Sequence, residues 1–593
     1  MDFKEKLHKL TLLFTNISDN RKILILSIVV SIVASLAAII LKTSVHFTQQ
    51  LLQNAFPEQE FNYLYLAFPI IGITLTVLFI VFFVKDDLSH GVSKVLYAIA
   101  RNKGRLKLHH TYSSIVSSTL TVGFGGSVGL EAPITLTGSA IGSQLGTFFQ
   151  LNTKNIIILT ACGATAAVAA IFNAPIAGVL FAIEVLMLDL TISSALPLLI
   201  SAVTAMSMSY ILLGRSIMFS SVSNMIPTFE MSNMPFYALL GIATGFYSVY
   251  FMRILAFTER SFKKIKKIPL RIITGGIALS VLIFLFPSFY GEGYETLNDI
   301  MMGDIRKIFN NSPFYAWQYR EGLLLLFLVF ILLFKTFATA FTTGAGGIGG
   351  VFAPSLFLGG IAGCLVATSI NTFFGCNLPV LSFTLAGMAG IMGSVMKAPL
   401  TAIFLIAEIS GGYHLFVPLM LTTLCSYVVF YNFEKYSVYT KSLAQSGDLI
   451  THHKDKHALS RLKVSSLIEN NFSTITPNAT LRDLLPIIEN SVRNIFPLVD
   501  DNGKFHGIII LDDVRHLIFH PEKYDNTYIK DLAFMPKATV KINEDMTNIV
   551  EKFKTTGLYN MVVLDANNNY YGFISRANVF SSYREIVESI SED

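Results

Sequence analysis

Apolar stretches separated by short polar connections run along the chain as far as residue 448. The clearest of them are residues 23–41, 63–84, 235–252, 269–286 and 322–334. Several approach the roughly 20 apolar residues that a helix needs to cross a bilayer, and the last is shorter. Beyond this part Lys, Asp, Glu and Asn occur throughout, as in soluble proteins. The pattern predicts an all-α polytopic membrane domain followed by a soluble domain.

Composition and charge agree with a membrane protein. The 593 residues are only 14% charged, against about a quarter in soluble chains. Residues 1–22 mix acids with lysines and lack a small-residue cleavage site, which predicts a cytoplasmic N-terminal helix and no secretory signal. The basic run at 260–267 is predicted to face the cytoplasm. A membrane loop argues against nucleic-acid binding, and we expect a multi-pass protein of the cell membrane with a cytoplasmic tail.

The membrane part contains a weak internal repeat. Residues 163–184 match residues 387–408 at an offset of 224 positions. Upstream of each copy lies a glycine-rich segment that ends in Ala-Pro, at 125–133 and at 347–354. Membrane transporters are often built from duplicated halves, with the binding site between them. The sequence therefore predicts two related halves, each with an interrupted helix.

The soluble tail is a second duplication, with an offset of 65 positions between its copies. Each copy has the pattern of a β-α-β-β-α unit, with its helix at 481–490 or 546–555. The predicted domains are the membrane domain at 23–448, a linker at 449–463, and two α+β units at 464–526 and 527–588.

Three glycine-flanked interruptions stand where helices are expected to begin inside the membrane: SHGVS (89–93), GLEAP (129–133) and GVFAP (350–354). Irregular backbone at membrane depth is tolerated only where it is buried or lines a wet cavity. The start of a helix presents unpaired N–H groups and the positive end of the helix dipole, which attract anions. Tyr439 could add a hydroxyl group. The sequence thus predicts an anion site that needs no Lys or Arg.

Glu131 is the one carboxylate within these three interruptions. An ionisable side chain inside a membrane is energetically costly and usually functional. When it is ionised, Glu131 would occupy the position of an anion, and when it is protonated or displaced it would open the path. We therefore predict that Glu131 is a gate and a candidate proton carrier.

Four motifs resemble the CLC family of chloride channels and chloride/proton exchangers, in the family's order: GSVGLEAP (126–133), FNAPIAGVLFAIE (172–184), GGVFAPSLFLGG (349–360) and SVYTKSL (437–443). The tail resembles a tandem CBS-domain pair, with HGIIILDDV and YGFISRANV as its strand-to-helix turns. The resemblance implies a CLC-like homodimer, with inverted-repeat halves and one anion pathway per subunit. It implies no required cofactor, and chloride or another small anion as the bound ion.

The resemblance also implies roles for single residues. Glu131 corresponds to the gating glutamate. The backbone amides of Val351 and Phe352 would face the central anion, and Tyr439 would contribute its hydroxyl.

The first motif departs from the family pattern, which is commonly GSGIP. His90, followed by Gly91, stands where a serine hydroxyl often contacts the anion. The imidazole could donate a ring N–H instead, or the backbone alone could matter, because ring orientation cannot be read from sequence. The gate motif also departs, since Ala132 replaces a glycine and could restrict the backbone beside Glu131.

A third departure bears on mechanism. Many exchangers of the family carry an inner glutamate where this chain has Val185. A valine cannot relay a proton, so the sequence favours a passive anion channel. A chloride/proton antiporter stays open as the alternative, because water could still reach Glu131. We interpret Glu184 and Glu408, a pair in the internal repeat, as structural acids that bind neighbouring helix ends.

CBS pairs often bind adenine nucleotides, with a hydroxyl and an acid that hold the ribose. The second copy has Ser575 but carries Asn578 in place of the acid. The first has Asp513 but carries Ile510 in place of the hydroxyl. Each copy keeps half of the pattern, which leaves two interpretations: a site for an adenine nucleotide, or a dimerising module without a ligand.

Other patterns lack the context that their chemistry needs. GAGGIG (344–349) follows an apolar span rather than a sheet strand, and GGSVG (125–129) lies in a membrane segment rather than at a nucleophile elbow. No enzyme activity is predicted. The pair His109-His110 is expected to lie in a loop without a metal. A magnesium transporter with CBS domains is the alternative from another class, although a cation path would need several converging acids.

Overall fold

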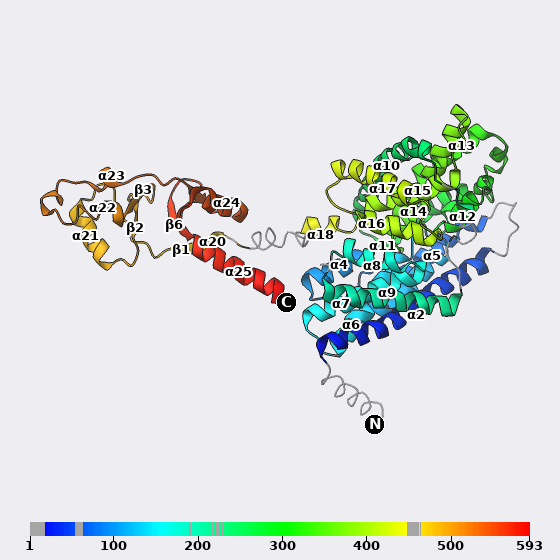
Figure 1. Cartoon of the computed structure of the whole chain (residues 1–593), viewed down its shortest axis with the longest axis horizontal. Coiled ribbons are helices and arrows are strands. Elements are labelled where there is room, and N and C mark those ends of the chain that lie inside the picture. Colours follow the sequence, from blue (N-terminus) through cyan, green and yellow to red (C-terminus); the bar gives the residue numbers. More distant parts are fainter. Residues whose placement is uncertain are drawn as a thin grey trace, which may run out of the picture. The chain divides into compact units, whose positions relative to one another are not determined.

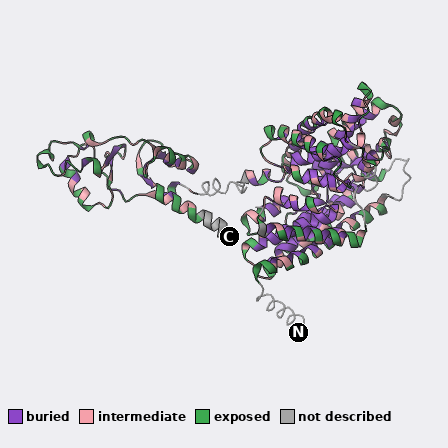
Figure 2. Ribbon diagram, viewed as in Figure 1, coloured by how far each residue is buried: buried purple, intermediate pink, exposed green. Residues whose placement is uncertain are grey.

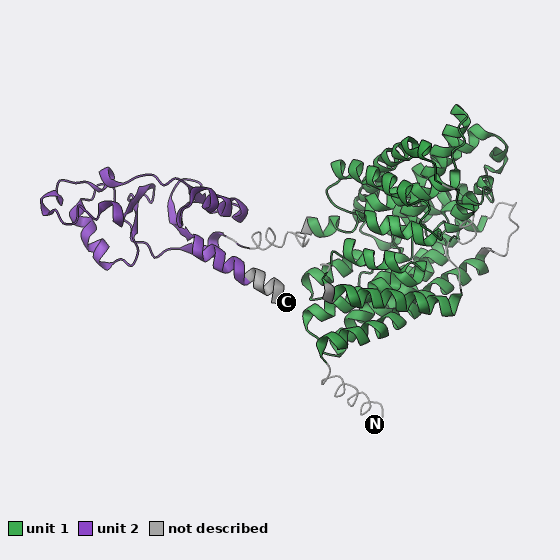
Figure 3. Ribbon diagram, in the orientation of Figure 1, with its two compact units in different colours: residues 1–449 green, residues 450–593 purple. Residues whose placement is uncertain are grey.

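The computed structural model describes residues 18–53, 63–188, 191–214, 219, 225–227, 229–446, 462 and 464–592. The chain divides into two compact units, residues 1–449 and 450–593 (Figure 3). The first unit is helical, and the second combines helices with short strands (Figure 1). This confirms the predicted fold classes. Most of the predicted N-terminal helix, 1–22, and nearly all of the predicted linker, 449–463, lie outside the described residues.

Nine helical stretches of the described chain are long and apolar enough to cross a membrane. The predicted span at 23–41 belongs to a longer helix, and the short one at 322–334 continues past Lys335 to Ala345. The helices of the first unit are α2 (Asp19–Gln53), α3 (Phe68–Phe79), α4 (Gly91–Arg101), α5 (His110–Gly123), α6 (Glu131–Phe148), α7 (Thr153–Phe172), α8 (Pro175–Glu184), α9 (Ile192–Leu213), α10 (Met234–Lys263), α11 (Ile268–Leu285), α12 (Tyr294–Met301), α13 (Glu321–Ala345), α14 (Phe352–Phe374), α15 (Val380–Met396), α16 (Pro399–Ile409), α17 (Phe416–Phe433) and α18 (Lys441–Ser446).

The internal repeat is visible as a repeated helix–turn–helix. α7 ends at Asn173 and α15 ends at Lys397, and both residues have a φ of 54°. This left-handed conformation stops each helix. Pro175 and Pro399 then begin α8 and α16, because proline is well suited to the first position of a helix. The two turns occupy equivalent positions in the repeat, so the predicted duplication is confirmed.

Small residues let helices of each half approach closely. A Cβ on Gly138 of α6 would lie 2.2 Å from the carbonyl oxygen of Gly163 in α7. In the other half, a Cβ on Gly359 of α14 would lie 2.3 Å from the carbonyl oxygen of Gly387 in α15. Glycine at such crossings is typical of helices packed in membranes. These helices form the buried interior of the unit, and its periphery is more exposed (Figure 2).

The direction of the helices gives the two sides of the membrane. The basic connection between α10 and α11 indicates the cytoplasmic side, because Lys and Arg accumulate in cytoplasmic loops. α11 then has 18 residues, which at about 1.5 Å per residue reach the opposite face. The segment at 286–320 therefore lies on the outer side, and α13 returns from it into the membrane.

The tail contains both predicted copies of the β-α-β-β-α unit. The strands form two sheets: β1 (Ile468–Glu469), β6 (Tyr570–Ser575), β5 (Asn560–Leu564) and β4 (Thr539–Lys541) in that order, and β2 (Ile495–Val499) with β3 (Phe505–Ile510). The helices are α20 (Val464–Leu467), α21 (Leu481–Asn490), α22 (Leu511–Val514), α23 (Ile529–Leu532), α24 (Met546–Thr556) and α25 (Arg576–Glu592). β1 of the first copy pairs with β6 of the second, so the copies share a sheet.

Candidate functional site

Two interrupted helices begin side by side inside the membrane unit. α6 starts at Glu131 and α14 at Phe352. Just before them, the Gly129 N–H donates to the Gly350 carbonyl (2.8 Å) and the Gly350 N–H donates to the Gly129 carbonyl (2.7 Å). A side chain has no room here, since a Cβ on Gly129 would lie 2.9 Å from the Cβ of Ala353. The positive ends of both helix dipoles therefore meet at one place.

The third interruption reaches the same place. α4 starts at Gly91, where a Cβ would lie 2.6 Å from the carbonyl oxygen of Ala132 in α6. Only glycine permits this close approach. His90, just before it, has a φ of 55°, in the left-handed region. The prediction that the three interruptions lie together is therefore confirmed.

Glu131 lies buried at this junction, with 2% of its surface exposed. Its Oε1 accepts a hydrogen bond of 2.8 Å from the Tyr294 hydroxyl. Its Oε2 has no hydrogen-bond partner among the described residues, although the backbone N–H of Ala353 at the start of α14 interacts with the carboxylate electrostatically. A carboxylate thus lies between two helix starts, where the backbone favours negative charge.

The other predicted anion ligands lie around this carboxylate. Tyr439 is buried, interacts electrostatically with Glu131, and has a hydroxyl without a partner among the described residues. Its carbonyl accepts a hydrogen bond of 2.8 Å from the Ser93 hydroxyl in α4, which ties it to the same junction. Val351 precedes the first residue of α14, and the ring of Phe352 is fully buried. The start of α14 and the Tyr439 hydroxyl therefore lie close to the Glu131 carboxylate.

The imidazole of His90 points to a different group. Its Nε2 lies 3.3 Å from Oε1 of Glu259, which also pairs with Lys263 at 2.7 Å. About half of the His90 side chain is exposed. It lines a cavity of about 380 Å³ with residues from the cytoplasmic ends of α10 and α11, including Arg271. In this structure, residue 90 contributes its backbone to the start of α4, and its ring faces the cytoplasmic mouth.

Val185 is buried at the end of α8. Both carboxylate oxygens of Glu184, the residue before it, accept hydrogen bonds. Glu184 accepts hydrogen bonds from the N–H groups of Leu400 and Thr401 at the start of α16 (3.1 and 2.7 Å). In the other half, Glu408 accepts two such bonds from the start of α8 (3.0 and 2.9 Å). The interpretation of both acids as structural groups at helix ends is confirmed.

Three ionisable residues near the gate were not predicted. Tyr294 and Glu292 follow α11 on the outer side, and Lys335 lies in the middle of α13. Glu292 accepts a hydrogen bond of 3.2 Å from the N–H of Leu130, next to the gate. Lys335 is completely buried. A lysine inside an apolar span is visible in the sequence and could have been recognised as functional, but nothing in the sequence connects it with Glu131.

One expectation about histidines was wrong. His110 does not lie in a loop but begins α5, and 4% of it is exposed. Its carbonyl accepts a hydrogen bond of 3.2 Å from Thr137 of α6, which explains its burial. The Nε2–H of its neighbour His109 donates to Asp86 at 3.0 Å. The pair was misjudged because packing of α5 on α6 is a tertiary contact.

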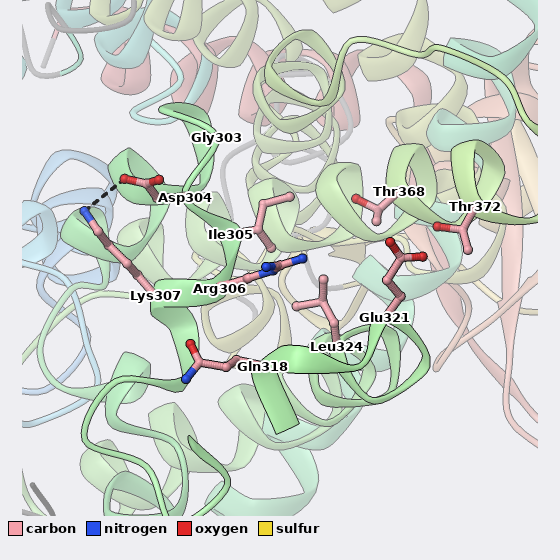
Figure 4. A pocket seen from close by; sticks show the side chains of 10 residues that line it. All are labelled: Gly303, Asp304, Ile305, Arg306, Lys307, Gln318, Glu321, Leu324, Thr368 and Thr372. Carbon is pink, nitrogen blue, oxygen red and sulfur yellow. Dashed lines mark ion pairs between the residues drawn. The ribbon is translucent and has the colours of Figure 1, made fainter. Parts of the chain in front are cut away.

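A cavity on the outer side lies apart from Glu131. It has a volume of about 470 Å³ and is lined by the segment before α13, the start of α13 and the end of α14. Arg306 and Glu321 are drawn within it, whereas the ion pair of Asp304 with Lys307 (3.1 Å) lies to one side (Figure 4). Its charged side chains are mostly exposed, and it contains none of the predicted anion ligands.

In the tail, the candidate nucleotide residues follow the last strand of each copy. The Ser575 hydroxyl accepts a hydrogen bond of 3.1 Å from the N–H of Asn578, so that it caps the start of α25. Asp513 is exposed in α22. The hydroxyl that would hold a ribose therefore also stabilises the start of α25.

Comparison with known proteins identifies the membrane unit. A family model described as voltage gated chloride channel matches residues 72–431, more than half of the chain. The chain belongs to this family. A CBS-domain model matches residues 464–520. The membership favours anion transport over the magnesium alternative, and no enzyme is among the relatives named below.

Three CLC relatives show the range of the family. A ClcB-like chloride channel protein of Ralstonia nicotianae is 29% identical over 368 residues, which cover 60% of this chain and 80% of that one. Chloride channel protein CLC-f of Arabidopsis thaliana is 24% identical over 68% of this chain and 56% of its own. The H⁺/Cl⁻ exchange transporter ClcA of Vibrio cholerae is 28% identical over 51% and 62%. The match therefore spans less than two thirds of the last two relatives.

Solved structures confirm the fold. A eukaryotic CLC transporter superposes with a TM-score of 0.59 at 15% identity, over 94% of this chain and 97% of that one. A slow cyanobacterial Cl⁻/H⁺ antiporter superposes with a TM-score of 0.56 at 23% identity, over 73% and 99%. The likeness establishes a CLC transporter fold with a CBS region. The family membership and the nine apolar helical stretches of the described chain indicate a multi-pass membrane protein with a cytoplasmic tail.

Proposed function

We propose that this CLC protein is a passive channel for chloride and other small anions, gated by Glu131. The observation that carries the proposal is the junction of α6 and α14, where Gly129 and Gly350 bond to each other. The carboxylate of Glu131 lies between the two helix starts and occupies a position that suits an anion. Protonation would neutralise this carboxylate and allow an anion to replace it.

The proposed anion position is formed by weak donors only. It comprises the backbone amides of Gly91, Val351 and Phe352 and the hydroxyl of Tyr439. Partial charges at helix starts attract an anion without a direct ion pair to Lys or Arg. Such a site suits conduction, because a conducted ion must leave as readily as it binds.

The absence of an inner acid at residue 185 supports a channel over an exchanger. Val185 cannot bind a proton, and Glu184 beside it is held by the start of α16. At this point of α8 no free carboxylate stands between the cytoplasm and Glu131. Proton movement coupled to chloride would therefore lack a carrier on the inner side.

The test uses purified protein in liposomes with an outward chloride gradient and a pH-sensitive dye inside. We expect chloride to leave while no proton moves against its gradient, as long as a second ion balances the charge. A protonophore added at the end shows that the vesicles were sealed. Sustained uphill proton movement that depends on the chloride gradient would contradict the channel.

A chloride/proton antiporter is the second candidate, because relatives named H⁺/Cl⁻ exchange transporters align with the membrane unit. Under this alternative, water would carry protons to Glu131 past Val185. The same liposome experiment separates the two functions, since an antiporter moves protons against their gradient. The Val185→Glu variant adds the missing acid, and coupled proton movement that appears only in this variant would support the channel proposal.

A further inference from the structure

Glu292 is a second carboxylate beside the gate. Its Oε1 accepts a hydrogen bond of 3.2 Å from the N–H of Leu130, the residue before Glu131. The two carboxylates are close enough to interact electrostatically. They differ in access, because Glu131 is buried and Glu292 is partly exposed on the outer side. Glu292 is therefore the more accessible of the two carboxylates to water on the outer side.

The turn that carries Glu292 is packed too tightly for side chains on the two residues that flank it. Gly291 and Gly293 flank the residue with φ values of 63° and 87°. A Cβ on Gly293 would lie 2.5 Å from the ring of Phe357 in α14, and one on Gly291 would lie 2.6 Å from the side-chain nitrogen of Gln49 in α2. Two glycines thus let the turn fit between α2 and α14 and direct the carboxylate toward α6.

Two lysines balance the charge of the two acids. Lys335 of α13 is completely buried, and its Nζ lies 4.7 Å from the centre of the Phe357 ring. Lys335 and Lys42 of α2 both interact electrostatically with Glu292. The hydroxyl of Tyr294 in α12 also faces both acids and donates to Glu131. Among the described residues, these are the charged and titratable groups that interact with Glu292.

The cluster links proton binding to anion binding. With both acids ionised, their charges cancel those of the two lysines. Neighbouring carboxylates repel each other when both are ionised, and one proton bound by the pair removes this repulsion. The protonated cluster then carries one net positive charge, and an anion that enters the gate restores neutrality.

We propose that Glu292 is the outer proton-binding residue of the gate. It takes a proton from the outer solution and passes it to Glu131, directly or through water. Each transfer breaks one O–H bond and forms another, and no other bond changes. The inference rests on the proposed gating by Glu131, and it explains why a second acid stands on the outer side, whereas Val185 stands on the inner side.

The test measures anion current across a membrane with the pH of the two solutions set independently. We expect acid on the outer side to raise the wild-type current several-fold. Glu292→Gln cannot bind a proton at this position, so its current should stay within about twofold over the same outer pH range. A titrating residue would instead change its ratio of protonated to ionised form tenfold for each pH unit. Glu295→Gln is the matched control, because Glu295 is exposed three residues away, and it should behave as the wild type.

Further variants separate the possible failures. Glu292→Asp keeps a titratable group, and we expect it to retain a response to outer pH with a shifted midpoint. If Glu292→Gln does not fold, an unchanged midpoint in Glu292→Asp contradicts the proposal. A wild-type outer pH profile in Glu292→Gln contradicts it as well. If Glu131→Gln also keeps the pH response, the gating role of Glu131 has failed, and not only the role of Glu292.

Discussion

His90 separates the role of a backbone from the role of a side chain. Its φ of 55° places it in the left-handed region at the start of α4, and its ring pairs with Glu259 at the cytoplasmic mouth. Such a backbone is common for glycine and tolerable for asparagine, whereas β-branched residues rarely adopt it. The left-handed backbone by itself restricts which residues suit position 90. No contact between the imidazole and an anion is needed to explain the residue found there.

Substitutions at His90 test this separation. We expect His90→Asn to conduct like the wild type, because asparagine accepts the left-handed backbone. His90→Val should lower the stability by about 1–3 kcal/mol, the usual cost of such strain, and reduce the flux through a displaced α4. The measurements are the melting temperature in detergent and chloride flux in liposomes. Loss of flux in His90→Asn with unchanged stability would assign the anion contact to the ring.

The residues around Glu131 show what a sequence can predict about such a site. Glu131 could be recognised because its glycine-rich interruption is local and continuous in the chain. Glu292 and Lys335 belong to segments more than 150 positions away, and only tertiary packing brings them close to the gate. The direction of the His90 ring was open for a related reason, since it depends on Glu259 in α10.

α8 and α16 connect the two halves of the membrane unit by reciprocal hydrogen bonds. Each helix ends with a glutamate that accepts hydrogen bonds from the first N–H groups of the other. Those N–H groups have no partner within their own helix. A carboxylate at a helix start is also favoured by the helix dipole. The repeated Ala-Pro and Glu of the sequence thus describe one symmetric contact.

Removal of either acid tests these reciprocal hydrogen bonds. Glu408→Ala leaves the N–H groups of Ile176 and Ala177 unpaired, and we expect it to lower stability by about 1–3 kcal/mol. Glu184→Ala should cost a similar amount at the start of α16. The melting temperature of each variant is compared with that of Glu321→Ala, which changes an exposed acid in the first turn of α13. Equal melting temperatures for all three would contradict a structural role.

A turn in the tail gives a pH-dependent contribution to stability. The N–H of Asn569 donates to Asp565 at 2.8 Å and lowers the pKa of its carboxyl below the ordinary value of 3.8. The N–H of Asn567 adds a bond of 2.7 Å. Because the pKa is lowered on folding, the ionised form contributes stability above the unfolded pKa. The contribution is lost as pH falls through the lower, folded pKa.

The variant Asp565→Asn tests the sign of this effect. We expect it to be slightly less stable than the wild type at neutral pH, and the difference to shrink as pH falls below about 4. Calorimetry of the full-length protein, which resolves the unfolding of the tail, measures it. A difference that grows on acidification would contradict the assignment.

The molecule as a whole combines a membrane unit with a tail whose regulatory role is open to experiment. The repeated motifs predicted both units, because each duplication leaves a constant offset in the chain. The shared sheet of the tail, in which β1 pairs with β6, could not be predicted, since a short strand carries no sign of its partner. We propose that the protein forms a homodimer, as the family resemblance implies, and cross-linking of the protein in membranes tests it.

Adenine nucleotides provide a test at the level of the tail. We expect ATP, ADP and AMP to leave its melting temperature unchanged, because Asn578 replaces the acid in the second copy and Ile510 replaces the hydroxyl in the first. A ligand present at 100 times its Kd would stabilise the tail by about 2.7 kcal/mol. A clear rise with any of the three nucleotides would support a nucleotide site that includes Asp513, Ser575 and Asn578.

The pH dependence of chloride flux in Glu131→Gln tests the gate most directly. Glutamine has the shape of a protonated glutamate but cannot ionise. We expect the variant to conduct at least as well as the wild type, with a flux that no longer changes with pH on either side. A folded variant that carries no chloride, or one that keeps the wild-type pH dependence, would contradict the account.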